Sequence, residues 1–197
     1  IKYINIMKKL ALFLSIIAAL HGSSAFSQEI EYDKTQNGER SIMCKYENVR
    51  SMKDKTVFSV ALQVEENSKE ELSYFLSLKT TSNTPITVPE GGILLLKLED
   101  DSIIELKTLM KYAGTVRDVH NINGYVFSDY TIFPSFPINE VQISKLSKGV
   151  KKIRIETIDG YRDKDFKKDK IGIAIKGQYD LLQNQLKKAS NDIRDGF

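Results

Sequence analysis

Five aromatic residues gather in a short stretch of the chain, and their side chains are suited to holding a ligand. They are Tyr125, Phe127, Tyr130, Phe133 and Phe136. Aromatic rings can bind sugars or apolar molecules through their faces. Strand alternation would place Tyr125 and Phe127 on one side and Tyr130 with Ile132 on the other, so at least one of these sets belongs to the core. We therefore predict Tyr125, Phe127 and Tyr130 as the candidate ligand-binding residues.

Nucleophilic or acid–base catalysis has few residues to draw on. Beyond position 27, the chain contains one histidine, His120, and one cysteine, Cys44. His120 stands in a polar stretch that we interpret as a loop, and no Gly-x-Ser-x-Gly motif accompanies it. Cys44 alternates with Ile42 and Tyr46, which predicts a buried thiol that behaves as a small hydrophobic group. We assign no catalytic residue, and the sequence favours a non-catalytic protein.

Carboxylates offer two further kinds of chemistry. Asp159, Asp163, Asp165 and Asp169 could supply oxygens to a hard cation, but the lysines and arginine among them would compete, so we predict a solvated charged loop. One cysteine and one histidine are also too few for a zinc site built from Cys and His ligands. We predict no metal and no cofactor. Glycan hydrolysis needs only a pair of acids, and none of the 26 acidic residues is singled out by spacing.

The first residues have the pattern of a secretory signal peptide. A basic start at residues 7–9 precedes the apolar run 10–20, and small residues follow it, with cleavage expected after Ala25 or, preferably, after Ser27. Residues 1–6 fit an artefact of an upstream start. The run is short for a membrane span, and residues 21–30 contain no cysteine for lipid attachment. We therefore expect export to the periplasm or beyond, without a retained membrane anchor.

Charge argues against nucleic acid as a partner. The chain has 29 basic and 26 acidic residues, but three lysines lie within residues 1–27, which contain no acid. The remaining 26 basic and 26 acidic residues balance, so no net field attracts phosphates. A protein or a glycan is the expected partner.

The elements that must position these residues are mainly strands. We expect a flexible segment over 28–40 and then one domain over 41–197. Alternating apolar residues predict strands at 41–47, 58–64, 72–79, 93–98, 103–107, 125–132 and 150–157. Asn139 and Gln142 predict a capped short helix over 140–147, ended by Gly149. A C-terminal amphipathic helix should present Ile171, Ile175, Tyr179, Leu182 and Leu186 to a sheet.

The segments 136–146 and 149–157, running on through 170–172, resemble small secreted proteins of Bacteroidetes-type bacteria whose function is uncharacterised. A looser similarity extends back to the hairpin between Leu94 and Leu106. The resemblance implies an exported antiparallel β-sandwich, immunoglobulin-like or similar, with a C-terminal helix. It supplies no catalytic motif.

Three functional hypotheses follow. The first is a non-catalytic binding or interaction module, because catalytic signatures are absent from the sequence. The alternative is an exported hydrolase that acts on glycans through Asp/Glu pairs. A third is an accessory subunit that packs its last helix onto a larger assembly, which would require the apolar face of that helix to be exposed.

Overall fold

The computed structural model describes residues 28–49 and 57–192. The predicted signal peptide over 1–27 lies outside these residues. The described elements, in chain order, are β1 (Ile30–Gln36), β2 (Glu39–Cys44), β3 (Glu47–Asn48), β4 (Val57–Glu66), β5 (Leu72–Ser82), β6 (Thr87–Val88), β7 (Ile93–Leu98), β8 (Ile103–Lys107), β9 (Tyr112–Ala113), β10 (Thr115–Ile122), β11 (Tyr125–Ile132), β12 (Ser135–Ile138), α2 (Glu140–Leu146), β13 (Val150–Thr157), β14 (Gly160–Asp165) and α3 (Ile171–Asp192).

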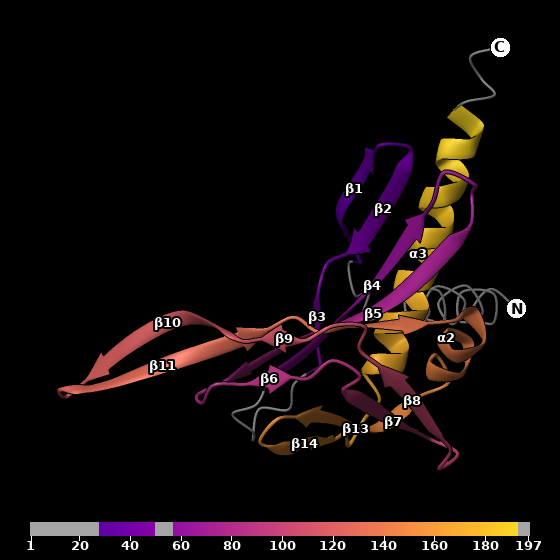
Figure 1. The fold of residues 1–197 in the computed structure, drawn as a ribbon. Helices are drawn as coiled ribbons and strands as arrows, with labels where there is room; N and C mark the ends of the chain where they lie inside the picture. Colours follow the sequence, from indigo (N-terminus) through magenta and orange to yellow (C-terminus); the bar gives the residue numbers. More distant parts are fainter. Residues whose placement is uncertain (1–27, 50–56, 193–197) are drawn as a thin grey trace, which may run out of the picture.

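The strands form two main antiparallel sheets (Figure 1). The large sheet has the order β1-β2-β4-β5-β11-β10, with β3 added to β4 and β12 added to β5. The small sheet has the order β14-β13-β7-β8, and β6 pairs with β9 separately. Buried residues of both sheets belong to one core, which makes the arrangement sandwich-like. The predicted fold class is confirmed: mainly antiparallel β-structure with a short helix and a C-terminal helix.

Alternation in β4 and β5 decides which face of the large sheet is buried. Val60 pairs with Leu78, and Leu62 pairs with Leu76, and none of these four side chains is exposed. Because directly opposed residues in an antiparallel pair point to the same side, they form one continuous apolar layer. We call this side the closed face.

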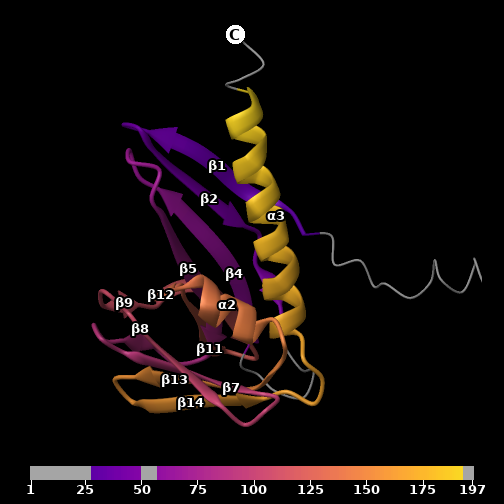
Figure 2. The same cartoon turned by 90° about the vertical axis from the view of Figure 1, so that its right-hand side faces the viewer.

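Helix α3 lies against the closed face (Figure 2) and contacts β4 and β2. Ile171, Ile175 and Leu182 are fully buried, and Tyr179 and Leu186 pack beside them. Their spacing of three and four residues confirms the predicted apolar face of this helix. The protein's own sheet covers the apolar face of α3, so this face is not exposed. The hypothesis of an accessory subunit, which required an exposed face, therefore loses its basis.

The short helix α2 begins with the predicted capping box. The Asn139 side chain accepts a hydrogen bond from the Gln142 backbone N–H at 2.9 Å, and the Gln142 side chain accepts one from the Asn139 N–H at 3.0 Å. Gly149 follows the helix with φ +126°, and a Cβ there would lie 2.5 Å from Glu99 Cγ. Only glycine fits that conformation and that space.

The expectation of a flexible segment over 28–40 is wrong, because this stretch forms β1 and the beginning of β2. Asn37 and Gly38 both have positive φ, as a two-residue hairpin turn requires, and they bring Lys34 opposite Ser41. The segment is polar because it lies at the edge of the sheet, where few of its side chains enter the core.

Besides the two-residue strands β6 and β9, three other longer strands were missed. The stretch around His120, interpreted as a loop, is β10, and the charged loop after the turn at Asp159 is β14. Pro134 was expected to mark the end of a strand, and β11 does end at Ile132. The chain then pairs with β5 again as β12, which includes Pro137. Proline is tolerated there because β12 has β5 as its one strand neighbour, so an unpaired N–H position is available.

Candidate functional site

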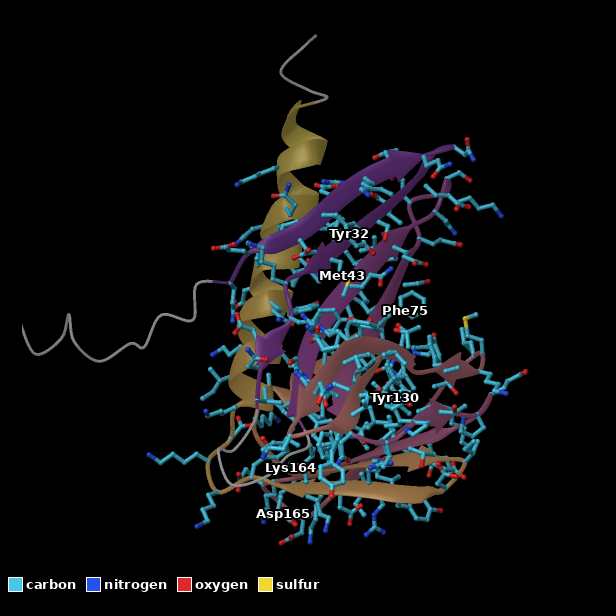
Figure 3. All side chains as sticks on the ribbon, turned by 90° about the vertical axis from the view of Figure 1, so that its left-hand side faces the viewer. Tyr32, Met43, Phe75, Tyr130, Lys164 and Asp165 are labelled. Carbon is cyan, nitrogen blue, oxygen red and sulfur yellow. The ribbon has the colours of Figure 1, made fainter. Side chains whose placement is uncertain are left out.

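The side of the large sheet opposite α3 is the candidate site, and we call it the open face. Neither described helix covers it (Figure 2). Cross-strand pairing places Tyr32, Met43, Gln63, Phe75 and Pro137 in one row across five strands. Figure 3 shows Tyr32, Met43 and Phe75 on this side of the molecule. Aromatic and polar side chains therefore stand together on a sheet face that no described helix covers, although Met43 in the middle of the row is buried by its neighbours.

A second aromatic group borders this row. The rings of Tyr46 and Phe133 lie 5.9 Å apart at an angle of 56°, a tilted contact. Burial raises the pKa of Tyr46 to about 12, so its hydroxyl is a neutral hydrogen-bonding group. The Tyr112 hydroxyl donates to the Ser135 carbonyl at 3.5 Å. The Tyr46–Phe133 pair thus extends the aromatic groups beside the row, whereas Tyr112 packs against the core.

A polar groove of about 680 Å³ lies at the end of the open face near the β1–β2 hairpin. It is lined by Tyr32, Lys34, Gln36, Asn37, Glu39, Arg40, Ser41, Glu65, Glu66, Asn67, Glu71 and Ser73. The Lys34 ammonium stands 5.6 Å from the centre of the Tyr32 ring. Hydroxyl, amide, carboxylate and ammonium groups therefore surround one aromatic ring.

Two of the groove's charged groups are held in place by neighbours. Glu71 accepts a hydrogen bond from the Asn67 side chain at 2.8 Å. Glu65 accepts a hydrogen bond from Gln63 at 2.8 Å. The groove is consequently built from side chains that are already oriented, as binding sites usually are.

The three aromatic residues predicted to bind a ligand lie on two different faces of one hairpin. Strands β10 and β11, residues 115–132, form an arm that projects from the side of the open face (Figures 1 and 3). Tyr130 pairs with Ser82 and packs against the core with Ile132. Tyr125 and Phe127 lie on the other side and are 71% and 51% exposed. The structure thus brings Tyr125 and Phe127 together and places Tyr130 apart from them.

Tyr125 and Phe127 share their side with the open face. Thr131 lies on the same side of β11, four positions beyond Phe127 and six beyond Tyr125. It pairs with Thr81 of β5, and their hydroxyl oxygens are 3.2 Å apart. Because β11 alternates without interruption, the arm's Tyr125 side continues the side that carries Phe75.

His120 and Cys44 lie in different surroundings. His120 Nε2 lies 3.3 Å from Asp129 Oδ2, and both side chains are well exposed on the arm. Cys44 is fully buried, and burial raises its pKa to about 12, so it is a thiol and a poor nucleophile. The prediction of a buried Cys44 is confirmed.

Three of the four aspartates considered for a cation make other contacts. Asp163 accepts two hydrogen bonds from Arg154, at 2.6 and 2.5 Å, and these lower its pKa to about 2. Lys152 lies 3.5 Å from Asp165, and Asp169 accepts from the backbone N–H groups of Val150 and Gly172. Within residues 28–49 and 57–192, no group of three or more potential ligands is placed to hold a metal ion.

The sequence reasoning missed Tyr32 and Phe75 as open-face residues, and it did not predict that Tyr46 would be only partly buried. Tyr32 lay in the segment expected to be flexible, and Tyr46 was assigned to the core beside Cys44. A longer view of alternation in β5 would have pointed to Phe75, because it lies between the buried Tyr74 and Leu76. Which side of the sheet would remain uncovered could not be read from the sequence.

Comparison with known proteins adds no identity: no protein-family model, curated protein or solved structure matches the chain. In the part of the chain that the structure describes, no helix combines the length and apolar character needed to cross a membrane.

Proposed function

We propose that this protein is an exported, non-catalytic binding module that holds a glycan on its open face. The observation that carries the proposal is the row of side chains from Tyr32 to Phe75, which no described helix covers. The basic and apolar pattern of residues 7–20 supports export to the periplasm or the cell exterior.

The chemistry of the groove favours a glycan over other ligands. A sugar offers an apolar ring face and several hydroxyl groups, each able to donate and accept. Tyr32 supplies an aromatic face, while Gln36, Asn67 and the carboxylates around it supply donors and acceptors. The groove's mixture of charges gives no strong preference for an anion or a cation.

The length of the aromatic surface suits an extended chain of sugars. Tyr32 lies on β1 at one edge of the sheet, and Phe75 lies three strands away on β5. The same side of the sheet continues into the arm, where Tyr125 and Phe127 are exposed. Several rings in sequence can each stack on one sugar unit, so we expect affinity to rise with oligosaccharide length.

The alternative of an exported hydrolase that acts on glycans has one supporting observation. Glu39, Glu65, Glu66 and Glu71 all line the polar groove, so paired carboxylates are available where the proposed glycan would lie. In that case the protein would release shortened sugars, and removing one carboxylate would stop the release.

The test is the retention of the purified protein in native gels that contain soluble neutral polysaccharides of different linkage. We expect retention in at least one of them, and we expect Tyr32→Ala and Phe75→Ala to abolish it. Tyr161→Ala is the matched control, because Tyr161 is 61% exposed but lies on β14 in the small sheet.

Two results would count against the proposal. Migration unaffected by every polysaccharide would remove glycan binding, and retention that survives both open-face substitutions would remove this site. Release of reducing sugars by the wild type, lost in Glu65→Gln, would establish the hydrolase instead.

A further inference from the structure

The arm has a second apolar side that the proposed glycan site does not use. Val116, Val119 and Val126 are 53%, 63% and 67% exposed. Pairing places Val116 opposite Tyr130, Val119 opposite Ser128 and Val126 opposite Asn121, so the three valines share the Tyr130 side of the arm. Exposed apolar clusters of this kind mark surfaces for interaction.

The edge of the arm is charged only near its base, where β10 carries Arg117 and Asp118 beside an irregularity in its pairing, and it is uncharged toward the tip. Native sheets usually guard their edges with charged residues or proline. The edge strand β1 carries Glu31, Asp33 and Lys34, and β14 carries four charged residues in succession. The tip of the arm, residues 121–128, has no charged residue and no proline. Strand β10 lies at the end of the large sheet and has a strand neighbour on one side only.

We propose that β10 pairs antiparallel with β10 of a second copy of this chain, which joins the two arms into one four-stranded sheet. A two-stranded hairpin that packs against nothing is barely stable in water, whereas a sheet of more strands with an apolar face is stable. The inference goes beyond the proposed glycan site, because it uses the edge and the valine side of the arm.

One register of the two strands is self-complementary. A two-fold axis at Val119 places the two Val119 side chains opposite each other and places Asp118 opposite His120 of the second copy. The first pair joins the valine sides into one apolar surface, and the second places a carboxylate, which accepts hydrogen bonds, opposite an imidazole, which can donate one. Balanced charge over residues 28–197 leaves no net repulsion between copies.

The test is sedimentation equilibrium of the purified protein over a range of concentrations. We expect the wild type to show a monomer–dimer equilibrium. Val119→Lys and Val119→Glu should each raise the dissociation constant by roughly a hundredfold, because like charges would face each other across the axis. An equimolar mixture of the two variants should form a heterodimer, since lysine then faces glutamate.

Val141→Lys is the matched control. Val141 is 66% exposed but lies on α2, away from the arm, so this variant should dimerise like the wild type. Circular dichroism spectra identical to wild type would show that the variants fold. A wild type that stays monomeric at every concentration would overturn the proposal. So would Val119 variants that dimerise normally, or a mixture that remains monomeric. Failure here leaves the glycan proposal standing, because its site lies on the other side of the arm.

Discussion

The two faces of the large sheet are built from alternate residues of the same strands, yet they differ in chemistry. On β5, Leu76 points to the closed face and is fully buried, whereas its neighbour Phe75 points to the open face and is half-buried. Helix α3 covers the first face and no described helix covers the second. The difference indicates that apolar residues on the closed face serve stability, while aromatic residues on the open face are available for binding.

The largest effect on the free energy of unfolding should come from truncating Leu76, and truncating its neighbour Phe75 should have a smaller effect. Leu76→Ala leaves a cavity under α3 and should lower the free energy of unfolding by about 3 kcal/mol. Phe75→Ala removes a partly exposed ring and should lower it by about 1 kcal/mol. Urea denaturation of both variants measures the difference. If Phe75→Ala proved as destabilising as Leu76→Ala, the open face would have to be part of a core.

A smaller effect should follow from breaking the contact that fixes α3 to the closed face. Buried Gln178 accepts a hydrogen bond from the Leu62 N–H at 2.9 Å and donates to the carbonyls of Lys45 and Val60 at 3.1 and 3.4 Å. These groups lie where the strand neighbour of β4 changes from β2 to β3, and neither of these strands pairs with Leu62. The side chain therefore completes the backbone pairing of the sheet.

Gln178→Leu keeps the volume but leaves these backbone groups without partners, so the free energy of unfolding should fall by about 2 kcal/mol. Gln183→Leu is the control on the same helix, because Gln183 makes one partly buried hydrogen bond, to the Tyr74 hydroxyl at 2.8 Å. It should lose about 1 kcal/mol. Equal losses in thermal or urea unfolding would show that Gln178 has no special role.

The smallest effect concerns the outward side of the small sheet, where charge replaces the aromatic groups of the open face. Arg154 lowers the pKa of Asp163 to about 2 through its hydrogen bonds. Because the folded value is below the ordinary value of about 3.9, the pair stabilises the protein above that pH, and the contribution disappears as pH falls toward about 2.

Solvent screening limits this contribution to below about 1 kcal/mol, because both side chains are partly exposed. Asp163→Asn should therefore lower the melting temperature slightly at neutral pH, and the difference from wild type should vanish near pH 2. A difference that stayed constant down to that pH would mean that the charge of Asp163 is not its cause.

Local features of the sequence determined most of the elements. Alternation in β4, β5, β7 and β8, the Asn139–Gln142 capping box and the spacing of Ile171, Ile175 and Leu182 each predicted a segment that the structure confirms. These patterns work because a strand and a helix have fixed periods, so burial on one side leaves a regular mark in the sequence.

Elements with few buried residues left no such mark. Strands β1 and β14 are polar because they lie at sheet edges, and their partners come from backbone pairing with β2 and β13. The aromatic pattern of β11 showed that Tyr125 and Phe127 oppose Tyr130 but could not say which set enters the core. Pairing of Tyr130 with Ser82 of β5 decided it.

The sequence by itself thus determined the periodicity of the strands and helices, the cap of α2 and the buried state of Cys44. Only the tertiary structure decided that α3 covers one face of the large sheet, that Tyr32 and Phe75 share the other, and that Gln178 completes β4. The physical reason is the separation along the sequence of the residues that interact. Periodicity and capping depend on residues a few positions apart, whereas Tyr32 and Phe75 meet on one face through pairing of three successive strands.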